Sequence, residues 1–237
     1  PPLRSRMNAV KTAFPTIPAI PASADPLRGT PEILYRDAAL LVVDKPAGLL
    51  TVPGRGEDKQ DCLSARLQAE FADALIVHRL DMHTSGVVVL ARGKEMQRRL
   101  SSQFANRQVE KRYVAVVAGK LLAASGEIDL PLSADWPRRP RQKVDPLAGK
   151  PSLTRYQVLA HDPTANRSRL LLIPLTGRTH QLRVHLLAIG HPIVGDALYG
   201  GNDLAPEDTR LLLHAETLAF AHPESRQPLR FFCPAPF

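Results

Sequence analysis

The sequence predicts an α+β fold built on a mixed, largely antiparallel sheet. Of its 237 residues, 44% are hydrophobic and 23% are charged, which is typical of a globular protein that can pack a core. Segments with strand character outnumber helical ones, and many follow one another directly. Because a doubly wound parallel sheet needs a helical crossover between its strands, this order favours antiparallel neighbours.

The folded body is expected to begin at residue 32 and to form one domain that extends to residue 237. Residues 1–31 contain seven prolines, with four basic residues against one acidic residue, and show no periodic apolar pattern. This composition predicts a Pro-rich, basic and disordered extension. We favour a passive tail, and the alternative is a basic arm that contacts a polyanion.

In the first half of the body, two short apolar runs predict strands at residues 33–37 and 40–46. Apolar residues recur at helical spacing over residues 60–75, which predicts a helix. The β-branched run at residues 86–92 predicts a further strand, and a second helix is expected at residues 94–107.

In the second half, residues 111–120 predict a strand. Further strands, separated by Pro, Asn and Gly turns, are expected at residues 126–132, 151–162, 167–175, 211–223 and 228–234. Residues 179–190 predict a helix that carries Leu182, Leu186 and Ile189 on one face, at i, i+4 and i+7.

The 31 basic and 23 acidic residues leave a formal net charge of +8, which suits a polyanionic partner. No apolar run approaches the ~18 residues of a membrane-spanning helix, so we expect no membrane association. The two cysteines, Cys62 and Cys233, lack the spacing of a disulfide scaffold or a zinc site. These features predict a cytoplasmic protein, with a monomer as the default state.

The first polar cluster, HRLDMHTSG at residues 78–86, lies between a predicted helix and an apolar strand. Functional side chains gain precise placement at the ends of rigid elements. In this setting Asp81 can serve as a nucleophile or a base, with His78 and Arg79 beside it. The alternative, equally supported by the residues alone, is a turn in which Asp and Thr side chains bond to nearby backbone.

The second cluster, LTGRTHQLRVH, opens the last predicted helix, which Thr176 or Thr179 can cap. Arg178, His180 and Arg183 crowd the start of this helix, where the helix dipole disfavours positive charge. Their placement is explained if an anion lies there, either a phosphate or a buried carboxylate. We favour this interpretation over three solvated side chains.

The third cluster is EKRYVAVVAG, a predicted strand. Alternation places Lys111, Tyr113 and Ala115 on one side and Arg112 and Val114 on the other. A tyrosine beside cations can stack on a base or act in acid–base chemistry. Strand preferences alone favour the simpler alternative, a half-buried core tyrosine.

The fourth cluster is DWPRRPRQKVD, in which two prolines are expected to hold the chain extended. It contains Arg138, Arg139, Arg141 and Lys143, next to the protein's single tryptophan. Basic side chains beside an aromatic ring suit a phosphate backbone and a stackable base. An ordinary solvated loop is an equally good interpretation of the residues alone.

Several chemistries lack their usual motifs. The chain has no GxGxxG, GxxxxGK[ST], HExxH or GxSxG pattern, so nucleotide-dependent, zinc-peptidase and nucleophile-elbow mechanisms lose support. His180 and His185 are five residues apart, which on a helix places them off a common face, and no metal site is expected.

These clusters resemble the signatures of the RluA-type RNA pseudouridine synthases. The resemblance rests on HRLDMHTSG, the K-x-Y of EKRYVAV and GRTHQLRVHLLAIGHPIVGDALYG, with LLVVDKPAGLLTVPG and LLLHAETLAFAHP as further blocks. It extends from about residue 32 to residue 237, with the blocks in the family's order. It implies the pseudouridine synthase fold, a mixed sheet flanked by helices and loops around a basic cleft, without a separate S4-type domain.

The resemblance also implies roles for individual residues. Asp81 would be the catalytic aspartate, Tyr113 would stack on the target base, and Arg178 would pair with Asp81. Arg79 would reach into the RNA where the target nucleotide flips out. Further RNA contacts are expected from His78, Arg138, Arg139, Arg141, Lys143, His180 and Arg183.

The implied activity is the isomerisation of specific uridines to pseudouridine, in stem-loops of 23S-type ribosomal RNA, transfer RNA or both. This rearrangement needs no cofactor and no metal. One rival is a noncatalytic RNA-binding protein, which the presence of Asp81, Tyr113 and Arg178 disfavours. A second is a glycosidase-like hydrolase, which requires another carboxylate. Asp44 and Asp196 are candidates, although no residue pattern connects either to Asp81.

Overall fold

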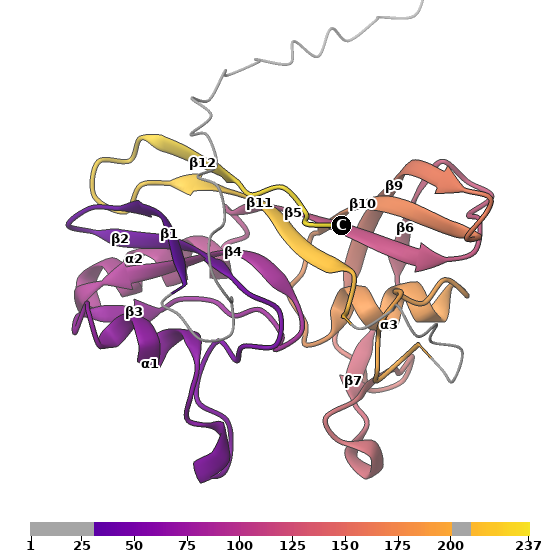
Figure 1. Cartoon of the computed structure of the whole chain (residues 1–237), viewed down its shortest axis with the longest axis horizontal. Helices are drawn as coiled ribbons and strands as arrows, with labels where there is room; N and C mark the ends of the chain where they lie inside the picture. The colour runs from indigo at the N-terminus through magenta and orange to yellow at the C-terminus, as the bar shows by residue number, and fades with distance from the viewer. Residues whose placement is uncertain (1–30, 201–209) are drawn as a thin grey trace, which may run out of the picture.

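The computed structural model of the protein describes residues 31–200 and 210–237 (Figure 1). The extension expected at residues 1–31 lies outside the described residues, apart from Pro31. Within those two described ranges, no helix is long and apolar enough to cross a membrane.

The strands are β1 (Glu32–Arg36), β2 (Leu40–Lys45), β3 (Ala74–Ile76), β4 (Ser85–Arg92), β5 (Glu110–Ala118), β6 (Ser125–Asp129), β7 (Leu132–Ala134), β8 (Gln142–Val144), β9 (Leu153–Asp162), β10 (Arg167–Pro174), β11 (Leu213–Ala221) and β12 (Pro228–Phe232). The α-helices are α1 (Leu63–Gln68), α2 (Gly93–Ala105) and α3 (Gln181–Ala188). Two short 3-10 helices, η1 (Glu57–Lys59) and η2 (Trp136–Arg138), lie in loops.

Ten of the strands form one sheet in the order β1-β2-β4-β11-β5-β10-β9-β6, with β3 also paired to β4 and β12 to β11. In the described part of the chain, β4 and β11 are the only parallel pair of this sheet. β7 and β8 form a separate hairpin. The predicted mixed, largely antiparallel α+β fold is therefore confirmed.

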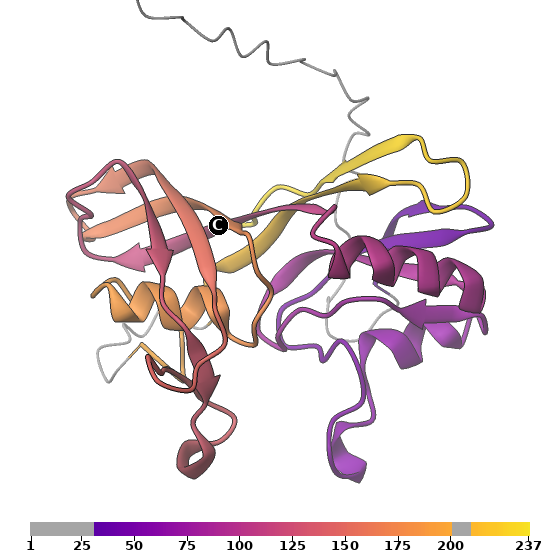
Figure 2. The same cartoon turned by 180° about the vertical axis from the view of Figure 1, so that it is seen from behind.

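β11 joins the two halves of the molecule. One half contains β1 to β4 with α1 and α2, the other contains β6, β9, β10 and α3, and Figures 1 and 2 show β11 and β5 between them. Gly86 of β4 faces Ala215 of β11, and a Cβ at Gly86 would lie 2.3 Å from the Ala215 carbonyl oxygen. The close parallel contact between the halves therefore requires glycine at this position.

The apolar run of β4 is buried on both faces, because side chains alternate across the sheet. Val87 and Val89 pack with Leu100 of α2 in one core cluster. Val88 and Leu90 pack with α1 in another cluster on the opposite face. A strand covered on both sides has no reason to alternate with polar residues, which explains its continuous hydrophobicity.

A third cluster lies beneath α3 and anchors the second half of the molecule. Leu182 and Leu186 are buried against Leu170 and Leu172 of β10, and Ile189 packs at the margin of the same cluster. The apolar face predicted for this helix is thus confirmed. Burying leucines in this way contributes about 1.5–3 kcal/mol per side chain and fixes the helix against the sheet.

α1 is shorter than the helix predicted over residues 60–75. It ends because Ala74, Leu75 and Ile76 pair with β4 as the strand β3, so the chain must leave the helix after Gln68 and turn. The helical periodicity of residues 60–75 does not reveal this competing pairing with β4, the next strand along the chain.

Candidate active site

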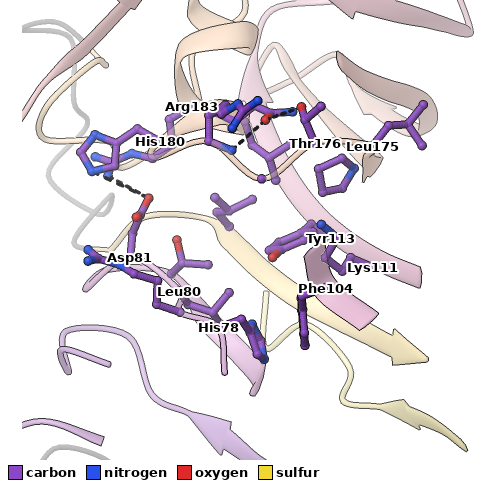
Figure 3. A pocket seen from close by; sticks show the side chains of 18 of the residues that line it. His78, Leu80, Asp81, Phe104, Lys111, Tyr113, Leu175, Thr176, His180 and Arg183 are labelled. Carbon is purple, nitrogen blue, oxygen red and sulfur yellow. Dashed lines mark hydrogen bonds and ion pairs between the residues drawn. The ribbon is translucent and has the colours of Figure 1, made fainter. Parts of the chain in front are cut away.

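A cavity of about 530 Å³ lies where the two halves of the sheet meet. Its lining includes Asp81 from the loop before β4 and Tyr113 from β5 (Figure 3). Arg178, from the loop before α3, also lines it. The three residues predicted to be catalytic therefore line one pocket. Asp81 and Arg178 come from opposite halves and Tyr113 from β5 between them, so the pocket exists only when the halves are joined.

The loop that carries Asp81 is held on both sides of this residue. Thr51 donates its hydroxyl hydrogen to the Leu80 carbonyl at 2.7 Å and accepts the Leu80 N–H at 3.2 Å. Lys45, which is fully buried, donates to the Met82 carbonyl at 3.0 Å. Asp81 itself keeps 19% of its side chain exposed to the pocket. The backbone is rigid at this position while the carboxylate stays accessible.

Lys45 uses its remaining hydrogens on two other backbone carbonyls, those of Pro46 and Leu49, each at 2.8 Å. Burial lowers the pKa of Lys45 to about 7, although the nearby Asp81 and Asp44 carboxylates oppose this shift. The side chain thus connects the loop after β2 with the loop of Asp81. Sequence reasoning placed no function on Lys45, because an exposed lysine is the usual expectation.

Asp81 faces two groups from the start of α3. The Nη1 atom of Arg183 lies 3.6 Å from its Oδ2 atom, and the Nε2 atom of His180 lies 3.8 Å from the same oxygen. Arg183 also forms a two-pronged ion pair with Asp196, with both N–O distances at 2.7 Å. Burial opposes the charge of Arg183, but Asp196 outweighs this and raises its pKa. Arg183 therefore presents a permanent positive charge to Asp81.

For Arg183, the anion is a buried carboxylate, one of the two anions that we considered, because it pairs with Asp196. The side chains of Arg183 and Asp196 are 3% and 0% exposed, and His180 is 9% exposed. Both side chains face carboxylates and also line the pocket, so the RNA contacts predicted for His180 and Arg183 stay predictions. Asp196, raised as a possible second carboxylate, is connected to Asp81 through Arg183.

The predicted pairing of Arg178 with Asp81 is wrong, because the arginine that faces the Asp81 carboxylate is Arg183. Arg178 is exposed, and its Nε atom donates to the Pro151 carbonyl at 3.3 Å. Neither threonine caps α3, since the residue before the helix is His180, with φ of 53°. Instead, the Gln181 Oε1 atom accepts from the Thr176 hydroxyl and from the Arg178 N–H, which orders the turn.

Tyr113 is the half-buried core tyrosine that strand preferences predict, since it packs against two core clusters, and it also lines the pocket. Its stacking on a base stays a prediction. Lys111 lines the same pocket, as strand alternation predicted. Burial, together with the Asp81 carboxylate, raises the pKa of Tyr113. Its hydroxyl therefore stays protonated at neutral pH, and the residue offers a ring face and a hydrogen-bond donor.

His78 lines the pocket, and its predicted contact with RNA stays a prediction. Its Nε2 atom accepts the Val89 N–H at 3.1 Å, and its ring stacks on Phe104 with centroids 4.5 Å apart. Burial lowers its pKa to about 3, and the charge of Lys111 adds to this shift. A neutral imidazole that accepts a backbone hydrogen bond holds the base of the loop and offers no positive charge to a phosphate.

Arg79 is exposed at the junction of the main pocket and a smaller cavity of about 280 Å³. The second cavity also borders Arg55 and Met82, in the loop that leads to η1 and the loop of Asp81. The contact of Arg79 with a flipped-out region of RNA remains a prediction, and its position between two concave surfaces is compatible with it.

The fourth cluster forms the β7–β8 hairpin and not an extended loop. Asp135 pairs with Arg138 at 2.8 Å, and η2 closes the tip. The guanidinium of Arg139 lies 3.4 Å from the ring centroid of Trp136, which is 67% exposed. This tip and the loop around η1 project from the same side of the molecule (Figures 1 and 2). Antiparallel pairing of residues 132–134 with 142–144 overrides the extended preference of the prolines.

One group of side chains that could hold a metal occurs among the described residues, and it lies outside the pocket. Ligand atoms of Asp44, His214 and Cys233 lie within 4.8 Å of one another. Both ring nitrogens of His214 are already engaged, by the Ser85 hydroxyl and the Cys233 carbonyl. Burial raises the pKa of the Cys233 thiol, which disfavours the thiolate that a metal needs. We assign no metal to this group.

Comparison with known proteins identifies the family. Residues 39–188 match the family model described as RNA pseudouridylate synthase. The chain belongs to this family and is an RNA pseudouridine synthase.

Its curated relatives include the dual-specificity RNA pseudouridine synthase RluA of Escherichia coli K12, which is 49% identical over 86% of this chain and 93% of the relative. The RluA protein of Yersinia pestis is 48% identical, over 86% of this chain and 99% of the relative. Among solved structures, human RNA pseudouridylate synthase domain containing 1 superposes with a TM-score of 0.74 at 31% identity. That match covers 91% of this chain and 87% of the human one.

Proposed function

We propose that this protein isomerises specific uridines in stem-loops of ribosomal RNA, transfer RNA or both. The observation that carries this proposal is the accessible Asp81 carboxylate, which lies 3.6 Å from a buried, permanently charged arginine in a pocket of about 530 Å³. A cavity of this size falls within the ~300–1,000 Å³ of small-molecule sites. It accommodates a nucleotide that has left its stack, and the two RluA relatives are named for acting on two substrates.

In the proposed reaction the C1′–N1 bond of the uridine breaks, the uracil turns, and a new bond forms between C5 and C1′. The proton on C5 is then lost to solvent. Asp81 attacks either the base or the sugar carbon, and both routes require its ionised form. Arg183 lies 3.6 Å from this carboxylate, and the two backbone anchors beside Asp81 fix its position.

Tyr113 is proposed to stack on the uracil and to donate a hydrogen bond from its hydroxyl. Because burial keeps this hydroxyl protonated, Tyr113 has no phenolate that could act as a base in the free enzyme. Placing the base against the ring repays part of the few kcal/mol that flipping costs. Arg79, exposed beside the pocket, is proposed to bind phosphate where the nucleotide has left the stack.

The hairpin is proposed to extend the RNA-binding surface. Arg138, Arg139 and Lys143 are exposed on it, and Arg141 lies 5.3 Å from the ring of Tyr199. Exposed guanidinium groups and the Trp136 ring suit a phosphate backbone and an unpaired base. We further propose that residues 32–237 act as one catalytic domain, in the cytoplasm and as a monomer.

Hydrolysis of the glycosidic bond is the weaker candidate. It needs a second carboxylate that can exchange a proton or activate water. Asp196, the carboxylate connected to Asp81, is fully buried and both its oxygens bind Arg183. It is therefore not available as an acid or base.

The test is tritium release from RNA that carries C5-tritiated uridine. The wild-type protein should release tritium to water, because forming the C5–C1′ bond expels the C5 hydrogen. Asp81→Asn, which keeps the shape of the side chain, should bind RNA within about twofold of wild type and release no tritium. Substantial release by the variant would remove Asp81 from the mechanism. Free uracil in place of tritium release would establish hydrolysis.

A further inference from the structure

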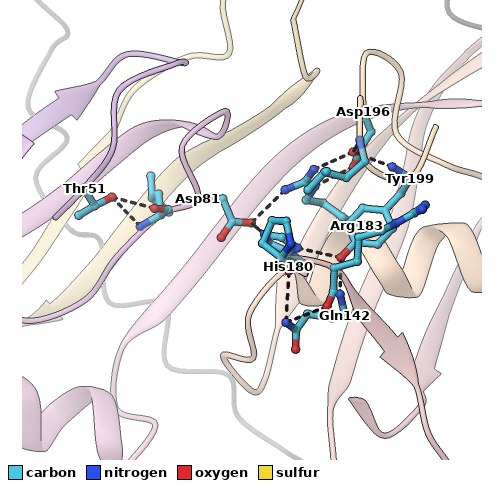
Figure 4. A network of polar contacts seen from close by, with 11 residues as sticks. Thr51, Asp81, Gln142, His180, Arg183, Asp196 and Tyr199 are labelled. Atoms are coloured by element: carbon cyan, nitrogen blue, oxygen red, sulfur yellow. Dashed lines mark hydrogen bonds and ion pairs between the residues drawn. The ribbon is translucent and has the colours of Figure 1, made fainter. Parts of the chain in front are cut away.

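The hydroxyl of Tyr199 connects the RNA-binding hairpin to the partners of Asp81 (Figure 4). It lies 2.7 Å from the backbone nitrogen of Gln142, the first residue of β8. It also lies 2.8 Å from the Nδ1 atom of His180. The other ring nitrogen of His180, Nε2, faces the Asp81 carboxylate at 3.8 Å. One continuous series of polar atoms therefore runs from the hairpin backbone to Asp81.

The hydrogens in this series can be assigned from the chemistry of each group. A backbone N–H only donates, so the Tyr199 oxygen accepts from Gln142. We assign the phenolic hydrogen, the only hydrogen that this hydroxyl can donate, to the Nδ1 atom of His180, which is unprotonated in that tautomer. Burial lowers the pKa of His180 and raises that of Tyr199, so both groups are neutral at pH 7. The single N–H of the imidazole is thereby placed on Nε2, toward Asp81.

Tyr199 is held in place by the same carboxylate that holds Arg183. Its backbone N–H donates to the Oδ1 atom of Asp196 at 3.1 Å, and its ring lies 5.0 Å from the guanidinium of Arg183. Only 4% of the residue is exposed. Asp196 therefore holds in place two series of contacts that end at the Oδ2 atom of Asp81. One runs through Arg183, and the other runs through Tyr199 and His180.

We propose that Tyr199 is a positioning residue, whose hydroxyl fixes His180 in the Nε2–H form and so holds the carboxylate of Asp81 for attack. The 3.8 Å separation becomes a hydrogen bond of about 2.9 Å after a shift of about 1 Å, and such contacts often tighten only when substrate is bound. The inference rests on the proposed role of Asp81. The inference adds that the backbone of the β7–β8 hairpin anchors the series of polar atoms at the end away from Asp81.

The first test uses Tyr199→Phe, which keeps the ring and removes the hydroxyl. Under single-turnover conditions with saturating RNA, tritium release should slow by about tenfold to a hundredfold, while the Kd for RNA changes by less than about twofold. Tyr35→Phe is the matched control, because it also removes a hydrogen-bonded hydroxyl, on Asp37, away from the pocket. An unchanged rate for Tyr199→Phe beside an active wild type would overturn this inference alone. An inactive wild type would instead overturn the proposed function.

A double-mutant cycle separates positioning from general destabilisation. In a His180→Ala background, Tyr199→Phe should reduce the rate by less than about twofold further, because the group that it orients is already gone. Full additivity of the two losses would contradict the proposal.

Nitrogen-15 NMR of labelled histidine gives the second readout, with the His180 signals assigned from their loss in His180→Ala. Wild type should show His180 protonated on Nε2, and Tyr199→Phe should shift the population toward Nδ1–H. A purely structural tyrosine would lower stability and leave the tautomer of the folded protein unchanged.

Discussion

Two arginines five positions apart in one motif have opposite environments. Arg178 is exposed and bonds to a backbone carbonyl, whereas Arg183 is buried between Asp81 and Asp196. Arg183 lies on the first turns of α3, where the packing of the helix directs it inward. The residue type and the motif are the same. Only the direction of the side chain decides that Arg178 lies at the pocket rim and that Arg183 faces the Asp81 carboxylate.

This contrast predicts unequal costs of substitution. Arg183→Ala should lower the free energy of unfolding by about 3–5 kcal/mol, because it leaves Asp196 buried without its charge partner. Arg178→Ala should change it by less than about 0.5 kcal/mol, since its side chain is exposed. Urea denaturation of both variants measures the difference. Similar losses in the two would contradict the assignment of Arg183.

His78 predicts a pH dependence of stability. Its folded-state pKa of about 3 lies below the value of 6.5 for an unperturbed histidine, so below pH 6.5 the unfolded chain binds a proton that the folded protein does not. The contribution of His78 to stability is therefore fully present above pH 6.5. It decreases as the pH is lowered below 6.5, by at most ~1.4 kcal/mol per pH unit. His78→Gln keeps an acceptor for the Val89 N–H without titrating there.

Urea denaturation between pH 4 and pH 7 compares the two proteins. The stability of His78→Gln should depend less steeply on pH than that of wild type, by up to one proton. Equal slopes would show that His78 gains its proton as readily in the folded protein as in the unfolded chain.

At the scale of single elements, a local sequence pattern predicted the structure where the period of the element alone decides which side chains share a face. The apolar face of α3 and the shared side of Lys111 and Tyr113 follow from the period of the element itself. The length of α1 and the hairpin of β7 and β8 depend on strands that compete for the same residues. Arg183, the partner of Asp81, lies more than 90 residues further along the chain. The excess of cations at α3 therefore indicated an anion, but not which arginine faces it.

The hairpin predicts how RNA binding depends on salt. Arg138→Ala with Arg139→Ala should weaken binding and reduce the slope of log K against log salt by about one to two, as expected for two lost phosphate contacts. Arg36→Ala with Arg98→Ala removes two exposed arginines away from the pocket and should leave the slope within about 0.5 of wild type. Filter binding across a salt series measures both. An unchanged slope in the hairpin variant would exclude it from the RNA interface.

At the scale of the whole molecule, the parallel contact of β4 with β11 holds the two halves of the pocket together. Gly86→Ala should destabilise the protein by roughly 2–5 kcal/mol, because the new methyl group adds a clash with Ala215 to the strain of a φ of 114°. Gly93→Ala is the matched control, since Gly93 has a φ of 77° and no atom within 4 Å of the added Cβ. Its cost should be about 1–2 kcal/mol. Thermal unfolding of both variants separates the two contributions, and equal losses would show that the contact tolerates a side chain.

The position of β11 also sets when the enzyme can first work. β4 and β5 are completed well before β11, yet β11 lies between them in the sheet. A chain emerging from the ribosome therefore holds Asp81 and Arg183 in two unjoined half-sheets until residue 221 has been made. Until that point the nascent chain lacks an assembled pocket, and we expect it not to modify the RNA of the ribosome that makes it.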